Sequence, residues 1–450
     1  MHEQKGLGGV RVAVIRLGCP KNDVDAEYMV GLLERAGCEV VEEPAAADVV
    51  IVNTCSFIRP ACDEAIETLL EAADLKAQGV RAVLCAGCLP ARYGSELAAE
   101  LAEIDGFLAP GAIEGVAEVV AAALRGERPV ALGRRGTFPQ AGWPRRNLDP
   151  PWRVNIKIAD GCSHGCTFCT IPFIRGRYQS QPVEALMGEV EAALSTGATE
   201  ICLIAQDTSS YGVDLGLQGG LVALLEKLSQ LIGPHRWLRV QYLHPDRLTA
   251  DLLAAMFDLP AVVPYFDLPF QHASERVLAA MGRRGSRKAY SRLVETIRRR
   301  NPDAAIRATF IVGFPGETQN DFHELLGFVA DVEADHVALF PFYAEEGTRA
   351  ARLPGRLPEP EVRRRLEELT DTAHSAAHRR AERFVGRRLR VLVEEHPGGG
   401  QYVGRTFRDA PQVDGAFYLL ARRRLAPGRF VDAVVTGAEV SDLFGREESA

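Results

Sequence analysis

The residues with the clearest chemical potential are three cysteines, Cys162, Cys166 and Cys169, spaced by three and then two residues. Three thiolates within eight residues can converge from one loop onto a compact site for a soft metal. No fourth cysteine lies within thirty residues on either side, whereas a structural zinc site takes a closed set of four ligands. The spacing therefore predicts an iron–sulfur cluster with one iron left open for a small molecule. A zinc knuckle or unrelated buried thiols are the alternative.

A second set of cysteines, Cys19, Cys55 and Cys88, is spread over the first hundred residues, and each member lies just past the end of a predicted strand. The carboxyl ends of parallel strands meet at one edge of a sheet, where such folds bind ligands. We therefore expect a second three-cysteine cluster there, again with an open iron; small core side chains are the alternative. The other four cysteines are interpreted as core or incidental residues, with Cys38 and Cys62 on helical segments and Cys85 and Cys202 inside apolar strands.

The elements that must position the second set alternate between strand and helix over the first 145 residues, which predicts a parallel-sheet α/β domain. The expected strands are 10–17, 47–53 and 81–86, and the expected helices are 23–36, 61–76 and 93–104. The stretch from Arg125 to Pro151 is rich in Arg, Gly and Pro and is predicted to be a linker.

A second strand–helix series begins at Trp152, with expected strands at 153–158, 200–205, 238–243, 262–270, 306–312 and 336–342. Six such units predict an incomplete (β/α)6 barrel of the TIM type, whose chemistry sits at the carboxyl ends of the strands. After a charged helical connector at 359–383, short strands at 389–394, 415–420 and 430–437 predict a small all-β barrel. The predicted domains are 1–145, 146–380 and 381–450.

Composition limits the classes of protein that fit. The 450 residues carry a net charge of −8, and a chain that binds nucleic acid usually has a basic surplus instead. No apolar run approaches the roughly 18 residues that span a bilayer, and the first residues do not form a signal peptide. We therefore expect a cytoplasmic protein without a membrane segment, in which ten cysteines indicate metal or catalysis before disulfides.

With both sets of cysteines placed, the chain resembles the methylthiotransferases of the radical S-adenosylmethionine (SAM) superfamily over essentially its whole length. The resemblance is carried by the runs 17–22 (LGCPKN) and 53–58 (NTCSFI) and by the central motif, in which Phe168 precedes the last cysteine. It implies two [4Fe–4S] clusters and a C-terminal TRAM barrel that docks substrate. Cys162, Cys166 and Cys169 would hold the cluster that binds and cleaves SAM, and Cys19, Cys55 and Cys88 the auxiliary one.

Within that family, the runs 18–22, 203–208 and 409–415 are similar to members that methylthiolate an aspartate of ribosomal protein uS12. The β-carbon of aspartate is essentially non-acidic, so a general base supplies too little catalysis and radical chemistry from a cofactor is required. The resemblance implies hydrogen abstraction by a 5′-deoxyadenosyl radical, sulfur insertion from the auxiliary cluster and methyl transfer from a second SAM. The implied partners are uS12 in the small ribosomal subunit, a one-electron donor such as flavodoxin or ferredoxin, and a sulfur donor.

The resemblance also implies contacts to SAM from other barrel residues. Phe168 would lie against the adenine, and Gln206 ends the second strand, where the superfamily holds the methionine amino group. Further cofactor contacts are expected from Gln271, Arg307, Gly313 and Glu317, which end the fourth strand or belong to the fifth strand and its exit. The alternatives are turn geometry for the glycine and ordinary barrel packing for Gln206, Gln271 and Arg307.

Two other functions stay open at this point. A tRNA adenosine methylthiotransferase would share both clusters and differ in substrate. A non-catalytic ribosome- or RNA-binding protein would use its clusters structurally, although structural sites are normally closed. Product analysis with uS12 and with tRNA separates the first two, and metal, sulfide and SAM-cleavage measurements identify the third.

Overall fold

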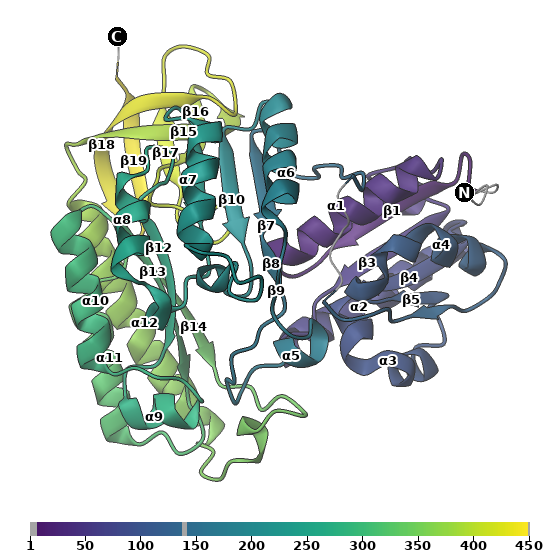
Figure 1. Cartoon of the computed structure of the whole chain (residues 1–450), viewed down its shortest axis with the longest axis horizontal. Helices are drawn as coiled ribbons and strands as arrows, with labels where there is room; N and C mark the ends of the chain where they lie inside the picture. The colour runs from purple at the N-terminus through teal and green to yellow at the C-terminus, as the bar shows by residue number, and fades with distance from the viewer. Residues whose placement is uncertain (1–6, 137–141, 449–450) are drawn as a thin grey trace.

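The computed structural model describes residues 7–136 and 142–448, which form three units along the chain (Figure 1). The first unit is a six-stranded, fully parallel sheet in the order β2-β1-β3-β4-β5-β6. Its strands are β1 (Arg11–Arg16), β2 (Glu39–Val40), β3 (Val49–Thr54), β4 (Ala82–Gly87), β5 (Gly106–Leu108) and β6 (Val130–Ala131). Its helices are α1 (Pro20–Arg35), α2 (Arg59–Asp74), α3 (Cys88–Glu100) and α4 (Val116–Leu124).

The central strands of this sheet are apolar on both faces because helices cover both. In β3, Val49 and Ile51 pack with α1 and α4, whereas Val50 and Val52 pack with α2 and α3, as the two-residue repeat of a strand requires.

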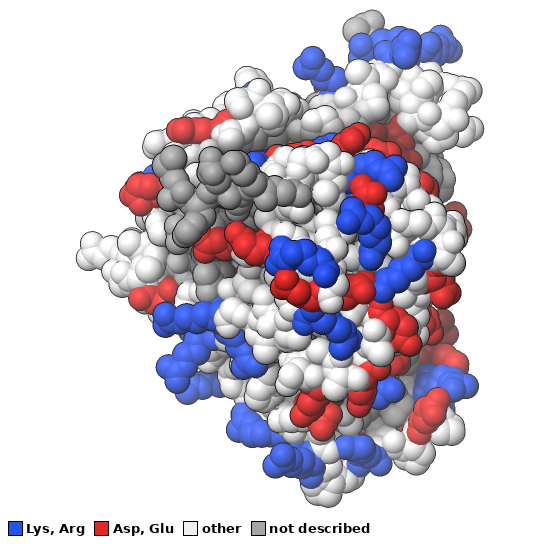
Figure 2. All heavy atoms as spheres, turned by 90° about the vertical axis from the view of Figure 1, so that its right-hand side faces the viewer, with Lys and Arg blue, Asp and Glu red and all other residues white. Residues whose placement is uncertain are grey.

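Acidic and basic side chains are interspersed over the face of the molecule on the right of Figure 1, and neither sign covers it (Figure 2).

Two sequence-based expectations for this unit were wrong in detail. The stretch from Arg125 to Pro151 is not only a linker, because β6 lies inside it and pairs with β5 at the sheet edge. Cys38 is not helical, because α1 ends at Arg35 and Cys38 directly precedes β2.

The second unit is the predicted incomplete barrel of six parallel strands. Two three-stranded sheets, β7-β10-β11 and β12-β13-β14, are joined by a bridge between Leu238 and Val262. The strands are β7 (Arg153–Lys157), β10 (Glu200–Ile204), β11 (Trp237–Val240), β12 (Tyr265–Gln271), β13 (Ala305–Val312) and β14 (His336–Pro341). The helices are α5 (Ile171–Ile174), α6 (Val183–Ser195), α7 (Gly220–Ile232), α8 (Ala250–Asp258), α9 (Glu275–Ala280), α10 (Arg287–Arg300), α11 (Gln319–Val332) and α12 (Glu359–Glu382). A short hairpin of β8 (Ala159–Asp160) and β9 (Gln179–Ser180) flanks the cysteine loop.

The third unit is a closed five-stranded barrel in the order β15-β16-β17-β19-β18. Its strands are β15 (Arg388–Gly398), β16 (Gln401–Arg405), β17 (Phe417–Leu420), β18 (Phe430–Glu439) and β19 (Asp442–Glu447). The sequence indicated β15, β17 and β18 but missed β16 and β19, because Gly and charged residues interrupt their apolar pattern. The predicted domain boundaries at 145 and 380 stay predictions.

The small barrel closes the amino-terminal mouth of the large one. Glu200 at the start of β10 is fully buried and accepts hydrogen bonds from Arg239 Nε (2.7 Å) and from Arg405 of the small barrel. Near the start of β13, Arg307 Nε donates to Asp414 (3.0 Å). The segment 405–414 thereby supplies the counter-charges for the floor of the large barrel.

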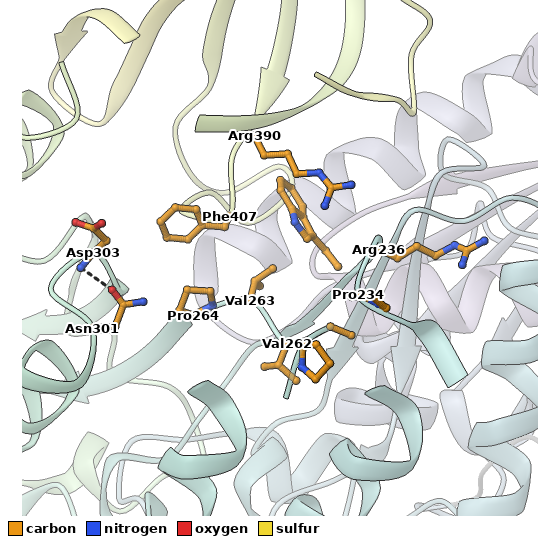
Figure 3. Close-up of a pocket in the computed structure, with 12 residues that line it drawn as sticks. Pro234, Arg236, Val262, Val263, Pro264, Asn301, Asp303, Arg390 and Phe407 are labelled. Atoms are coloured by element: carbon orange, nitrogen blue, oxygen red, sulfur yellow. Dashed lines mark hydrogen bonds between the residues drawn. The ribbon is translucent and has the colours of Figure 1, made fainter. Parts of the chain in front are cut away.

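A cavity of about 330 Å³ lies beside this seam (Figure 3). Arg390 and Phe407 line it from the small barrel, and Pro234, Arg236 and the segment 260–264 line it from the large barrel. All of these barrel residues lie at the amino-terminal ends of strands. The cavity is therefore at the end of the barrel opposite to the cysteines.

Candidate active site

The loop that carries Cys162, Cys166 and Cys169 connects β8 to α5 at the carboxyl end of the first barrel strand. Gly161 makes the entry to this loop possible, because it has φ +73° and any Cβ there would collide with the carbonyl group of Arg177. The backbone is then fixed by a hydrogen bond from Cys162 N to the Gly176 carbonyl oxygen (3.1 Å). The loop position agrees with a barrel active site.

The three thiols of this loop lie close enough to influence one another electrostatically. Burial, and then the nearby Cys166 thiol, raise the pKa of Cys162 to about 11, against the lowering effect of the His164 amide. Burial likewise raises the pKa of Cys169 to about 12, and the other two thiols add to the increase. The thiols of Cys162 and Cys169 are therefore neutral near pH 7 and would have to lose their protons to hold iron.

The second set of cysteines gathers at the carboxyl edge of the N-terminal sheet, as its topology predicts. Cys19 is the N-cap residue of α1, Cys55 directly follows β3, and Cys88 opens α3. Glycines permit this approach: a Cβ on Gly18 would lie 2.7 Å from Cys55 Cβ, and one on Gly87 would lie 2.5 Å from the Asn53 side chain.

The thiols of the second set also influence one another. Burial, with a smaller contribution from the Cys19 thiol, raises the pKa of Cys55 to about 11 and that of Cys88 to about 12. Arg175 Nη2 lies 3.3 Å from Cys88 Sγ and partly opposes this increase. Three soft donors and a nearby cation form a set that fits an anionic cluster better than a closed structural site.

A single bound ion fits neither set. Among the residues that the structure describes, no three His, Cys, Asp or Glu side chains are arranged to hold one metal ion. The cysteines of a cubane cluster bind different irons, so their sulfurs lie further apart than the ligands of one ion. The absence of such an arrangement therefore concerns sites for a single metal ion. The two iron–sulfur clusters stay a prediction.

A buried charge network joins the two cysteine sets across the domain junction. Arg175, which follows the barrel loop, pairs with Asp25 of α1 and with Asp160 of β8. Lys157 of β7 pairs with the same two carboxylates. Burial would raise the pKa of Asp160, but Lys157 and Arg175 hold it well below its usual range. Two cations and two anions thus neutralise one another where the units meet.

Gln206 lies beside this network at the end of β10. Its Nε2 donates to Asp160 Oδ1 (2.9 Å), and its Oε1 is a buried acceptor without a partner among the described residues. Phe168 packs against the edge of the barrel core. Gln271 has φ +71° at the end of β12, a strained conformation of the kind that occurs at functional sites.

The remaining predicted cofactor residues are engaged within the protein. Arg307 is paired with Asp414 and lies 3.5 Å from Asp267. Glu317 accepts from the Gly313 amide through Oε2 (2.8 Å) and from Arg365 Nη1 of α12 through Oε1 (2.6 Å). The cofactor roles of these residues stay predictions.

Three family models match the chain in the order of its three units. They are the uncharacterized protein family UPF0004 over residues 11–109, the radical SAM superfamily over residues 156–329, and the TRAM domain over residues 385–447. The two sets of cysteines fall in the first and second of these regions.

Curated relatives cover almost the whole chain. The ribosomal protein uS12 methylthiotransferase RimO of Pelotomaculum thermopropionicum is 42% identical over 97% of this chain and 99% of its own length. The RimO of Moorella thermoacetica is 45% identical over 91% of this chain and 93% of its own. The chain belongs to the RimO family. It is therefore a radical SAM methylthiotransferase, an enzyme that uses SAM and an iron–sulfur cluster.

Solved structures share the fold of this RimO-family chain. TsrM of Kitasatospora setae, a radical SAM methyltransferase solved with cobalamin and a [4Fe–4S] cluster, has a TM-score of 0.56 at 15% identity, over 76% of this chain and 77% of its own. The cobalamin-dependent SAM radical enzyme OxsB has a TM-score of 0.53 at 11% identity, over 82% of this chain and 58% of its own. Within its described residues, the RimO-family chain contains no helix long and apolar enough to cross a membrane.

Sequence reasoning missed three polar side chains beside the cysteines of this RimO-family enzyme. Arg175 was missed because its partners lie 150 and 15 residues away. His164 Nε2 lies 2.6 Å from Asp207 Oδ2, and hydrogen bonds from His164 and two serines lower the pKa of that carboxyl to about 2 although burial would raise it. Lys21 was part of a quoted motif, but only the fold shows that its side chain is buried at the domain junction.

Proposed function

We propose that this enzyme methylthiolates the β-carbon of an aspartate in ribosomal protein uS12, with two [4Fe–4S] clusters and SAM. The observation that carries the proposal is the pair of open three-thiol sets at the carboxyl edges of two parallel sheets, connected through Arg175. Two sets of three soft donors leave one coordination position open on each cluster. The names of the relatives support uS12 as the substrate.

In this proposal Cys162, Cys166 and Cys169 hold the cluster that binds SAM, and Cys19, Cys55 and Cys88 hold the auxiliary cluster. When bound, these groups supply one-electron cleavage of SAM, a radical that abstracts hydrogen, and the sulfur and methyl group that are added. The protein contributes position: the Arg175 network fixes the N-terminal sheet against the cysteine loop of the barrel. Precise spacing of reacting groups accounts for much of catalysis by orientation.

The proposed SAM contacts gain unequal support from the geometry. The unpartnered Oε1 of Gln206 suits a donor such as the methionine amino group. Phe168 and Gln271 lie at the same mouth of the barrel. Arg307, Gly313 and Glu317 would act by holding the barrel floor and the turn after β13, since their polar groups are already paired.

The proposal includes the surroundings of the enzyme. We place it in the cytoplasm, where it would meet the small ribosomal subunit, a one-electron donor such as flavodoxin or ferredoxin, and a sulfur donor. The net charge of −8 supports a protein substrate over an RNA, because phosphate contacts favour a basic protein.

The test is a product assay with anaerobically reconstituted enzyme. It is incubated with SAM, reductant and sulfide together with uS12 or ribosomes, and in parallel with hypomodified tRNA. Mass spectrometry should find one added methylthio group on a uS12 aspartate and none on tRNA. Methylthiolated adenosine with unmodified uS12 would overturn the proposal in favour of the tRNA enzyme. SAM cleavage without either product would leave neither substrate supported.

A further inference from the structure

Lys21 is a buried cation at the junction between the N-terminal sheet and the barrel. It lies in the first turn of α1, two residues after Cys19, and its side chain is directed onto the ring of Tyr242 from the barrel. The ammonium nitrogen is 3.3 Å from the ring centroid, and only 7% of the residue is exposed. The side chain therefore reaches from one unit to the other beside a proposed auxiliary-cluster ligand.

Two local effects oppose a lysine at this position. The amino end of a helix carries a partial positive charge, so its first turn favours acidic side chains over basic ones. Burying an ammonium group also removes its hydration, which is unfavourable unless an anion compensates. A buried lysine in the first turn of a helix goes against both effects. Such departures from local preference are expected at functional sites.

The other cations at this junction already have carboxylate partners. Arg175 and Lys157 share Asp25 and Asp160. In the part of the chain that the structure describes, Lys21 forms no ion pair with a carboxylate, and its contact is the face of Tyr242. A cation–π contact of this kind replaces part of the lost hydration and leaves the charge able to attract an anion.

The groups that face Lys21 come from the start of α1, from the segment just after β11 and from within β12. They are the Cys19 thiol, the Tyr242 phenol and, further away, the Asp267 carboxylate. Asp267 is occupied, because it accepts from the Tyr242 amide (2.9 Å) and lies 3.5 Å from Arg307 Nη1. Tyr242 itself has φ +61°, an unusual conformation for a tyrosine that directs the chain at this mouth of the barrel.

We propose that Lys21 binds the carboxylate of the substrate aspartate and is a specificity-determining residue of this enzyme. The inference rests on the proposed function and adds to it the group that recognises the target side chain. In aspartate the carboxylate is bonded to the β-carbon, so a cation that holds the carboxylate also fixes the carbon that reacts.

SAM also carries a carboxylate, and the position of Lys21 distinguishes the two sources. Lys21 neighbours Cys19, whereas SAM is assigned to the cluster of Cys162, Cys166 and Cys169. The structure therefore assigns Lys21 to the substrate and predicts that SAM binds without it.

The test compares wild type, Lys21→Met and Lys21→Arg in the full chain with both clusters reconstituted. Methionine keeps most of the length and apolar volume and removes the charge, whereas arginine keeps the charge. Each protein is assayed on uS12 with its target Asp and on uS12 with Asn at that position. Equilibrium binding of both uS12 forms, SAM affinity, and iron and sulfide content are measured alongside.

We expect Lys21→Met to lower kcat/KM for the Asp substrate on the order of 10- to 100-fold, the size of a lost charged hydrogen bond. The preference for Asp over Asn should collapse in activity and in binding, and Lys21→Arg should restore part of it. Iron content and SAM affinity should match the wild type.

Several results would overturn the inference while the proposed function stands. An unchanged preference for Asp over Asn in Lys21→Met would show that the Lys21 ammonium does not recognise the substrate carboxylate. A loss of SAM affinity would assign the cation to SAM, and a loss of iron would assign it a structural role at the auxiliary cluster. Failure of the wild type itself to modify uS12 would instead remove the proposed function, and this inference with it.

Discussion

Replacing Arg175 by methionine tests whether the buried charge network holds the two cysteine sets together. The Arg175 side chain is 3% exposed and pairs with Asp25 and Asp160, while its Nη2 donates to Asn22 Oδ1 (2.7 Å). Methionine fills much of the same volume but leaves two buried carboxylates with Lys157 as their remaining cation. The substitution therefore creates one uncompensated buried negative charge.

The expected cost follows from this charge count. Removing one partner of a buried ion pair typically costs about 3–5 kcal/mol. By contrast, the Arg146 and Glu34 side chains of the same junction are 50% and 38% exposed, and exposed pairs contribute about 0–1 kcal/mol. Arg146→Met is therefore a matched control that removes an arginine of the junction without burying a charge.

The assay is hydrogen exchange of the α1 amides, together with chemical denaturation of the iron-free chain. Arg175→Met should increase exchange in α1 and lower the denaturation midpoint, while Arg146→Met should stay near the wild type. Adding Asp25→Asn to Arg175→Met removes the excess charge and should recover part of the loss, which a double-mutant cycle measures. Equal behaviour of the two arginine variants, or no recovery in the double variant, would refute the reasoning.

Three further predictions concern the cysteine sets and the barrel floor. Cys162→Ala should abolish SAM cleavage. Cys55→Ala should still release 5′-deoxyadenosine but form no methylthiolated product. Full methylthiolation by Cys55→Ala would contradict the assignment of SAM cleavage and sulfur insertion to different clusters. Gly161→Ala should lower iron content because its Cβ meets the Arg177 carbonyl, whereas Gly197→Ala, with open space around it, should not. Burial would lower the pKa of His336, but Asp414 and Asp409 raise it above its ordinary value. The stabilisation from the charged His336 is therefore fully present below about pH 6.5 and is lost as the pH rises through the raised pKa. As the pH is raised through this range, the denaturation midpoint of the wild type should fall more than that of His336→Gln.

The sequence predicted the features that follow from local pattern. The sequence alone predicted that Cys19, Cys55 and Cys88 lie close together, because parallel strands end at one edge of a sheet. The structure places all three at that edge. Glycines at positions 18 and 87 permit their close approach, but a glycine in a sequence does not reveal which atom would collide with a side chain. Patterning identified the elements; it did not identify their contacts.

Tertiary pairing explains most of what was missed. Arg175 and Asp25 are 150 residues apart, and their interaction exists only once the barrel has packed against α1. The strands β16 and β19 were missed because each is short and contains glycine, so that neither shows a clear alternation. Barrel closure, and not local propensity, determines that these segments are strands.

The position of the TRAM barrel changes how its role should be tested. The family resemblance implies that it docks substrate, yet Arg405 and Arg408 also neutralise Glu200 and Asp335, which are fully buried in the barrel floor. Deleting the domain would leave these carboxylates without those partners, so lost activity in a truncated chain would report barrel damage as well as docking. Substitutions on the exposed outer face, such as Tyr418→Ser, leave the ion pairs intact. Only such variants separate substrate docking from support of the barrel.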